Sequence, residues 1–158
     1  MKRIPLFLAS LLLTLVAAAN PQYTVTHRTN AMSDLVTAIG ATGALMVLTG
    51  AAPASVATID TGTVLVVLPL STTAGTVSAG VLTFNAITSA TASATGNAAH
   101  FLICTTNVTA NCVAASSTTR VIQGTVATSG ADLNFGSIAF SSGQTVSVTS
   151  FSITAIGA

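Results

Sequence analysis

The chain has 158 residues, of which 51% are hydrophobic and only 4% are charged, with a formal net charge of +1. Soluble domains carry about 25% charged residues, so the side chains used for acid–base catalysis, metal binding and phosphate binding are nearly absent. This composition argues against an enzyme, against a cofactor or small-molecule substrate, and against a nucleic-acid partner. A surface with so little charge favours self-association instead.

The first nineteen residues have the pattern of a secretory leader. A basic start at Lys2 and Arg3 precedes an apolar run, residues 4–16, and small residues at 17–19. Because this run is too short to span a bilayer comfortably, we expect residues 1–19 to be a signal peptide and residues 20–158 to form a single domain. A retained hydrophobic arm that packs into a neighbour, which would be the only route to a membrane, and a wrongly chosen upstream start codon are the alternatives.

The stretch 29–40 is the one good helix candidate, after an extended lead-in over 20–28. Thr29 or Asn30 can cap its start, Asp34 would lie in its first turn, and Gly40 suits its end. Its apolar side chains form one stripe: Met32, Leu35, Val36 and Ile39. We expect this stripe to lie on a sheet, with a partner-binding helix as the alternative.

The rest of the chain has the pattern of short strands separated by turns that contain glycine. The expected strands are 44–49, 63–70, 77–85, 86–95, 98–105, 120–128, 133–140 and 145–155. Many short strands with little helix indicate an all-β fold, an antiparallel β-sandwich or a jelly-roll-like domain.

Two of these strands carry sharper expectations. Thr63 to Leu70 is apolar on both faces, which predicts a place in the middle of a sheet or at a contact between subunits of an oligomer. In the last strand, Val148 and Phe151 would point to opposite faces of a regular strand. We therefore expect a bulge or sharp bend near Thr149 and Ser150, or a strand that moves from one sheet to another. An unbroken strand buried on both sides is the alternative.

Cys104 and Cys112 are the only cysteines. In an oxidising compartment such a pair tends to form a disulfide, which we expect here; two unrelated buried thiols are the alternative. A zinc site made with His100 would lack a fourth ligand close by. His27 and His100 are isolated, and the sequence predicts no catalytic, cofactor-binding or metal-binding residues.

The order and spacing of several segments from Arg28 to Ala155 resemble a family of small tailed-bacteriophage virion proteins. The segments that carry the resemblance are Arg28-Thr29-Asn30-Ala31-Met32, Ala44 to Gly50, Ala51-Ala52-Pro53-Ala54, Thr95-Gly96-Asn97-Ala98-Ala99-His100-Phe101, Gln123-Gly124-Thr125-Val126, Ser129 to Asn134, and Gly143 to Phe151. The resemblance implies a non-enzymatic structural subunit of the virion, a capsid decoration (cement) protein or a tail-associated component. It also implies that the partners are other copies of this chain and other capsid or tail proteins.

The predicted leader points to a second function. A secreted bacterial or archaeal β-protein could polymerise outside the cell into a surface layer or an extracellular filament. The expected location is therefore the virion, with the extracellular space as the alternative.

Overall fold

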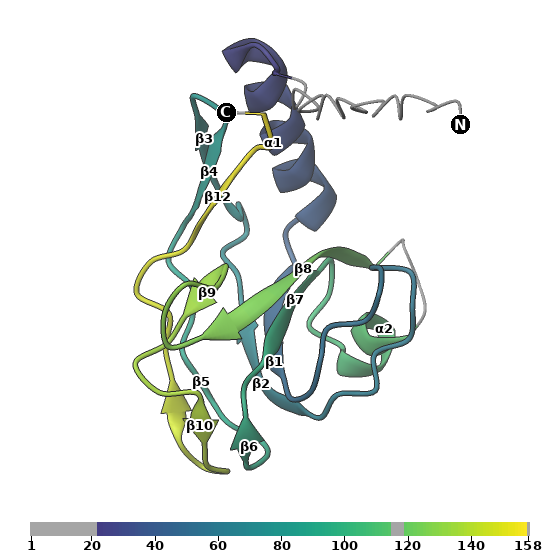
Figure 1. Cartoon of the computed structure of the whole chain (residues 1–158), viewed down its shortest axis with the longest axis vertical. Coiled ribbons are helices and arrows are strands. Elements are labelled where there is room, and N and C mark those ends of the chain that lie inside the picture. The colour runs from purple at the N-terminus through teal and green to yellow at the C-terminus, as the bar shows by residue number, and fades with distance from the viewer. Residues whose placement is uncertain (1–21, 115–118, 158) are drawn as a thin grey trace, which may run out of the picture.

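The computed structural model describes residues 22–114 and 119–157, and over these ranges the protein consists mostly of strands with one main helix (Figure 1). This confirms the expectation of a mainly-β chain with an N-terminal helix. The predicted leader, residues 1–19, lies outside the described residues.

The largest sheet has five strands in the order β2-β1-β7-β8-β9 and is strongly curled (Figure 1). Its strands are β1 (Ala44–Leu48), β2 (Val64–Pro69), β7 (His100–Cys104), β8 (Arg120–Ala127) and β9 (Leu133–Asn134). The pairs are antiparallel except for the short parallel pair of β8 with β9. Every residue of β1 and β7 is buried, so this pair forms the centre of the fold.

A second sheet lies at the other end of the long axis, beside helix α1 (Val25–Ile39) (Figure 1). Its order is β12-β4-β3, with β3 (Gly75–Ser78), β4 (Val81–Phe84) and β12 (Ser152–Thr154). Two short pairs complete the fold: β5 (Ala90–Thr91) with β11 (Thr145–Val146), and β6 (Gly96–Asn97) with β10 (Ala139–Phe140). A short helix, α2 (Thr109–Val113), follows β7.

Helix α1 begins four residues earlier than the sequence pattern predicted, because its cap is Thr24 and not Thr29 or Asn30. The hydroxyl oxygen of Thr24 accepts a hydrogen bond from the backbone N–H of His27, which satisfies a free donor of the first turn. Asp34 therefore lies in the middle of the helix, not in its first turn. The helix ends at Gly40, whose φ of 69° suits glycine.

The apolar stripe of α1 packs on the main core, as expected. Ile39 is fully buried, and Met32, Leu35 and Val36 are partly buried against the same core. That core is shared by the five-stranded sheet, the α1 side of the fold and the last part of the chain.

The predicted strand 77–85 is wrong in one respect: it is not a single strand but contains the end of β3, a hairpin turn and β4. The chain turns at Ala79 and Gly80, where both residues have positive φ, 50° and 80°. This is the geometry of a tight two-residue hairpin turn, and its usual sequence signal, an Asn or Asp before the glycine, is missing here. Likewise, only Ala90–Thr91 of the predicted strand 86–95 pairs in a sheet.

Strand β2 is buried on both faces but does not lie in the middle of its sheet. Leu65, Val66 and Leu68 pack in the main core, and Val67 packs against a second cluster around Met46. β2 is the terminal strand of the five-stranded order. Its outer edge is covered by the segment 88–93, because the Ser93 N–H donates to the Leu65 carbonyl over 2.8 Å.

The last strand is interrupted where the parity of its apolar residues predicted a bend. β11 pairs with β5, whereas β12 pairs with β4 in a different sheet. The chain thus moves from one sheet to another between Val146 and Ser152. This change returns Val148 and Phe151 to the same main core. Within the described residues, no helix has the length and apolar character needed to cross a membrane.

Candidate functional site

The densest group of polar contacts surrounds α2, in a part of the fold that we call the α2 region: α2, the loop 51–62, and the adjoining ends of β7 and β8. Cys104 at the end of β7 and Cys112 in α2 are joined by a disulfide, with their Cα atoms 5.8 Å apart. Both cysteines are fully buried. The expected pairing is therefore present, and it anchors α2 to the central strand β7.

Arg120 is the first residue of β8 and is buried although it is charged, with only 1% of its surface exposed. Its guanidinium group donates five hydrogen bonds to backbone carbonyls. Nε and Nη2 both donate to Cys112, Nη2 also donates to Val113 and Ala114, and Nη1 donates to Thr58. These carbonyls belong to the end of α2 and to the loop 51–62, so one side chain satisfies the free acceptors of a helix terminus and holds a loop against it.

His100 and Asp60 form a buried pair next to this arginine. Nε2 of His100 lies 2.7 Å from Oδ2 of Asp60, with both side chains 1% exposed. Nδ1 of His100 lies 2.9 Å from the carbonyl oxygen of Gly50. Because a carbonyl oxygen can only accept, Nδ1 carries the proton of that bond. Both ring nitrogens therefore have partners.

The remaining groups of Asp60 are also bonded. Its Oδ1 accepts from the N–H of Gly62 over 2.8 Å, and its own N–H donates to the carbonyl of Val113 over 2.9 Å. Gly62 is required by this close packing, because a Cβ there would lie 2.3 Å from the Thr49 carbonyl oxygen and 3.2 Å from the His100 ring.

The electrostatic cost of burial is visible at Arg120. Burial lowers the pKa of the Arg120 guanidinium from its ordinary value, and the nearby charge of Asp60 opposes that shift. A charge is tolerated in a buried site only when it is paired and fully hydrogen-bonded, and Asp60, His100 and the five bonds of Arg120 meet this condition.

The arrangement resembles part of a catalytic triad only in residue type. A histidine that acts as a base needs one ring nitrogen facing a nucleophile or a substrate, whereas both nitrogens of His100 are occupied and its ring is fully buried. Neither cysteine is available as a ligand, so the zinc alternative is wrong. The contacts of the α2 region therefore anchor loops.

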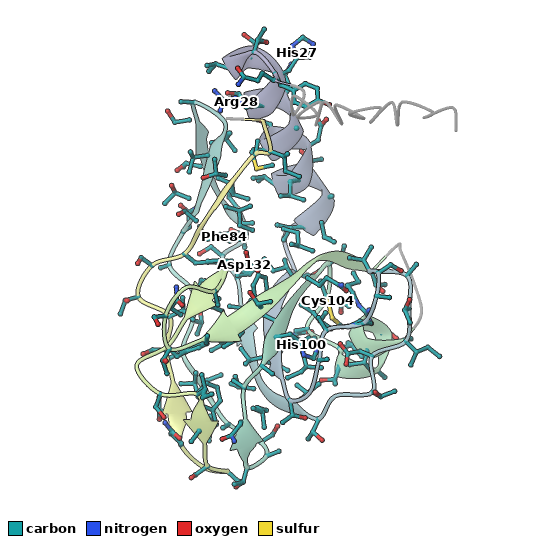
Figure 2. The ribbon with its side chains drawn as sticks, in the orientation of Figure 1. His27, Arg28, Phe84, His100, Cys104 and Asp132 are labelled. Carbon is teal, nitrogen blue, oxygen red and sulfur yellow. A yellow bond between two sulfur atoms is a disulfide. The ribbon has the colours of Figure 1, made fainter. Side chains whose placement is uncertain are left out.

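His27 is far from this region: Figure 2 shows it near the free end of α1, whereas His100 and Cys104 lie beside α2. Its Nδ1 lies 2.8 Å from the hydroxyl oxygen of Thr24, so it takes part in the helix cap. Among the described residues, no three His, Cys, Asp or Glu side chains gather as metal ligands would.

Sequence reasoning missed the roles of Asp60, His100 and Arg120. Their partners are separated by up to 62 positions, as in the contact of Arg120 with Thr58, and no local spacing reveals such a contact. One signal was available: charged residues are so rare in this chain that each one within an apolar stretch is a candidate for a buried pair.

Two surface hollows of the described residues lie elsewhere, and both border the last part of the chain. The first, of about 410 Å³, is polar and is lined by Thr83, Asp132, Leu133, Asn134 and residues 149–152. The second, of about 390 Å³, is apolar and is lined by Tyr23, His27, Arg28, Ala31, Met32, Ala155 and Ile156.

Comparison with known proteins gives no relative. No protein-family model matches the chain, and neither a curated protein nor a solved structure does.

Proposed function

We propose that this protein is a non-enzymatic structural subunit that assembles with copies of itself. The observation that carries the proposal is the scarcity of charge on its surface. The described residues contain five charged side chains, of which Asp60 and Arg120 are buried. That leaves Arg28, Asp34 and Asp132 to keep copies apart by charge, in a surface otherwise made mostly of uncharged polar residues, small residues and scattered apolar ones.

The more specific form of the proposal is a virion protein, either a capsid decoration subunit or a tail-associated one. Its support is the resemblance of the segments from Arg28 to Ala155 to small tailed-phage structural proteins. A sandwich-like or jelly-roll-like arrangement belongs to this proposal too. The mainly-β fold with short strands and a shared core is compatible with it. The expected partners are other capsid or tail subunits.

The test has two stages. Sedimentation and electron microscopy of the purified protein should show discrete oligomers or particles; a monomer up to the highest soluble concentration would contradict assembly. Mass spectrometry of virions induced from cells that carry the gene should then detect the protein in stoichiometric amounts. Its absence from virions, together with its presence in the culture medium, would contradict the virion form.

The disulfide favours a second candidate, the secreted protein that polymerises into a surface layer or filament. Disulfides persist in oxidising compartments and are rare in the cytoplasm, where phage heads and tails assemble. Fractionation of producing cells discriminates the two candidates: a secreted subunit should be recovered outside the cell without residues 1–19, and a virion subunit with intact phage particles.

A further inference from the structure

The free edge of strand β12 has the features of an assembly contact. β12 is the terminal strand of the three-stranded sheet in what we call the α1 region: α1, β3, β4 and β12. On its inner side it pairs with β4, where Ala155 N–H donates to Gly80 and Phe84 N–H donates to the carbonyl of Phe151. Figure 1 shows β12 beside β4, with the chain running on toward α1.

These two bonds determine which backbone groups of β12 point outward. In an antiparallel ladder, residues alternate between bonding to one neighbour and facing the other side. Because residues 151 and 155 bond to β4, Ile153 does so too, and Ser152 and Thr154 direct their N–H and C=O groups to the outer side. None of these four groups has a partner among the described residues.

Nothing in the sequence protects this edge. Natural sheets block exposed edges with lysine, proline or a bulge, whereas Ser150 to Ile156 contains neither a charge nor a proline. Next to it stand the side chains of Tyr23 and Ile156, which are 53% and 88% exposed, and both line the apolar hollow of about 390 Å³.

We propose that β12 of one copy pairs antiparallel with β12 of a second copy, about a two-fold axis at Ile153. In this register Ser152 of each copy faces Thr154 of the other. All eight outward groups of the two strands are then used, in four backbone hydrogen bonds, and the two sheets join into one of six strands. Ile156 and Tyr23, next to the edge, would bury apolar surface along the same contact.

The absence of charged residues from Ser150 to Ile156 supports a second copy of this chain as the partner. The edge strand is self-complementary, and no charge lies on it to repel an identical strand. This inference rests on the proposed self-assembly and specifies which surface carries it.

A cysteine crosslink tests this register directly. Opposite residues in a pair that is not hydrogen-bonded have Cβ atoms about 4.5 Å apart, a separation that a disulfide can bridge. Ile153→Cys should therefore give a covalent dimer under mild oxidation, seen by non-reducing electrophoresis. Val77→Cys is the matched control: it lies in the same cross-strand row, on the same face and half-buried, but at the opposite edge of the sheet.

Proline variants test the backbone bonds. Ser152→Pro removes one outward donor from each copy without removing a bond to β4, and it should lower the association constant by about tenfold or more. Ser152→Thr keeps the N–H and should associate as the original does. Thr154→Pro removes the other outward donor, so the test survives if the first variant misfolds; circular dichroism checks the fold of each.

Each result bears on the inference. A crosslink at Ile153→Cys that is absent at Val77→Cys and lost with either folded proline variant supports it. Oligomers that form without this crosslink, or that crosslink equally at both positions, overturn the β12 contact while leaving the proposed function standing. A protein that stays monomeric overturns both. Association that occurs only after residues 1–21 are removed would mean that these residues block the β12 edge of their own chain. That result would overturn the contact for the full-length chain.

Discussion

The two arginines of the described chain show how differently its two regions are built. Arg120, in the α2 region, is fully buried and donates five hydrogen bonds, next to a bonded aspartate and histidine. Arg28, in the α1 region, is half-buried over the β3–β4 turn, and its Nε has no hydrogen-bond partner among the described residues. In the α2 region Asp60, His100 and Arg120 are satisfied internally, whereas the α1 region leaves an edge strand and an apolar hollow open.

This difference predicts which substitutions should lower the stability of the subunit and which should weaken its association. A buried polar network is costly when one member is removed, because the others are left unpaired. Substitutions on a surface with free backbone groups and exposed apolar side chains should change the stability of the isolated subunit little. They should change the association constant when two copies bind through that surface. Four variants test this division, from the largest effect on the free energy of unfolding to the smallest.

The largest loss in the free energy of unfolding is expected from Arg120→Met. The substitution leaves the end of α2 and Thr58 with unpaired carbonyls and leaves Asp60 without its neighbouring cation. We expect the free energy of unfolding to fall by about 3–5 kcal/mol, measured by urea denaturation. Arg28→Met is the matched control and should change it by less than about 1 kcal/mol, since it removes a group that has no partner. Equal losses for the two variants would contradict the comparison.

Removing the disulfide should have the next largest effect. The two cysteines are eight positions apart in sequence, and opening a loop of this size costs about 2–3 kcal/mol by the chain-entropy argument. The double variant Cys104→Ala with Cys112→Ala should therefore unfold at a lower temperature in calorimetry. The original protein, once denatured and refolded in a reducing agent, should unfold at the same lower temperature. A double variant as stable as the original would show that Arg120 alone holds α2 in place.

In the α1 region, the helix cap is the most sensitive single contact. Thr24→Ala removes the acceptor for the His27 N–H, and we expect a loss of about 1 kcal/mol. Thr24→Ser keeps the hydroxyl and should behave as the original. Hydrogen exchange of the first turn of α1 should speed up in the alanine variant without a change in the α2 region. Faster exchange in both regions would mean that they unfold as one unit.

The smallest effect concerns Asp132, which lines the polar hollow together with Thr83 and residues 149–152. Its Oδ2 accepts from the N–H and the hydroxyl of Thr125, each over 2.8 Å. The backbone bond first, and then the hydroxyl bond, hold the pKa of Asp132 below its usual value against a raising effect of burial. A carboxyl group whose pKa is lower in the folded state stabilises the protein above its ordinary pKa of about 3.9 and loses that contribution as the pH falls.

Asp132→Asn should therefore melt slightly below the original protein at neutral pH. The gap between their melting temperatures should close as the pH falls below about 4. Asp34→Asn, on the exposed face of α1 and without this pair of bonds, serves as the control for the loss of one carboxyl group. A gap at pH 7 that persists unchanged at pH 3 would show that the Thr125 bonds do not depend on the charge of Asp132.

Much of the fold could be predicted because it follows from local patterns. The apolar stripe of α1, the buried strand Ala44–Leu48 and the sheet change between Val146 and Ser152 are all visible in the spacing of hydrophobic residues. The start of α1 was missed because Thr24 and Thr29 are equally good caps in sequence. Only the packing of the earlier turns on the β3–β4 hairpin, where the Gly80 N–H donates to the Thr29 hydroxyl oxygen, discriminates them.

The other errors have a similar cause. The Ala79–Gly80 turn lacks its usual sequence signal, so the hairpin looked like a single strand. Of the candidate site, only the cysteine pair could be predicted, since its members are close in sequence. The contact of His100 with Asp60 spans 40 positions and depends on how the loop 51–62 folds back over β7.

The scarcity of surface charge also determines how the protein should respond to its solvent. Added salt acts on charged surfaces by screening them, over a Debye length of about 8 Å at physiological ionic strength, and here there is little to screen. Salts such as sulfate, which are excluded from protein surfaces, strengthen apolar burial instead. The proposed assemblies should therefore tolerate a change from fresh to saline surroundings and tighten with sulfate, as either proposed form, a virion or an extracellular filament, would require.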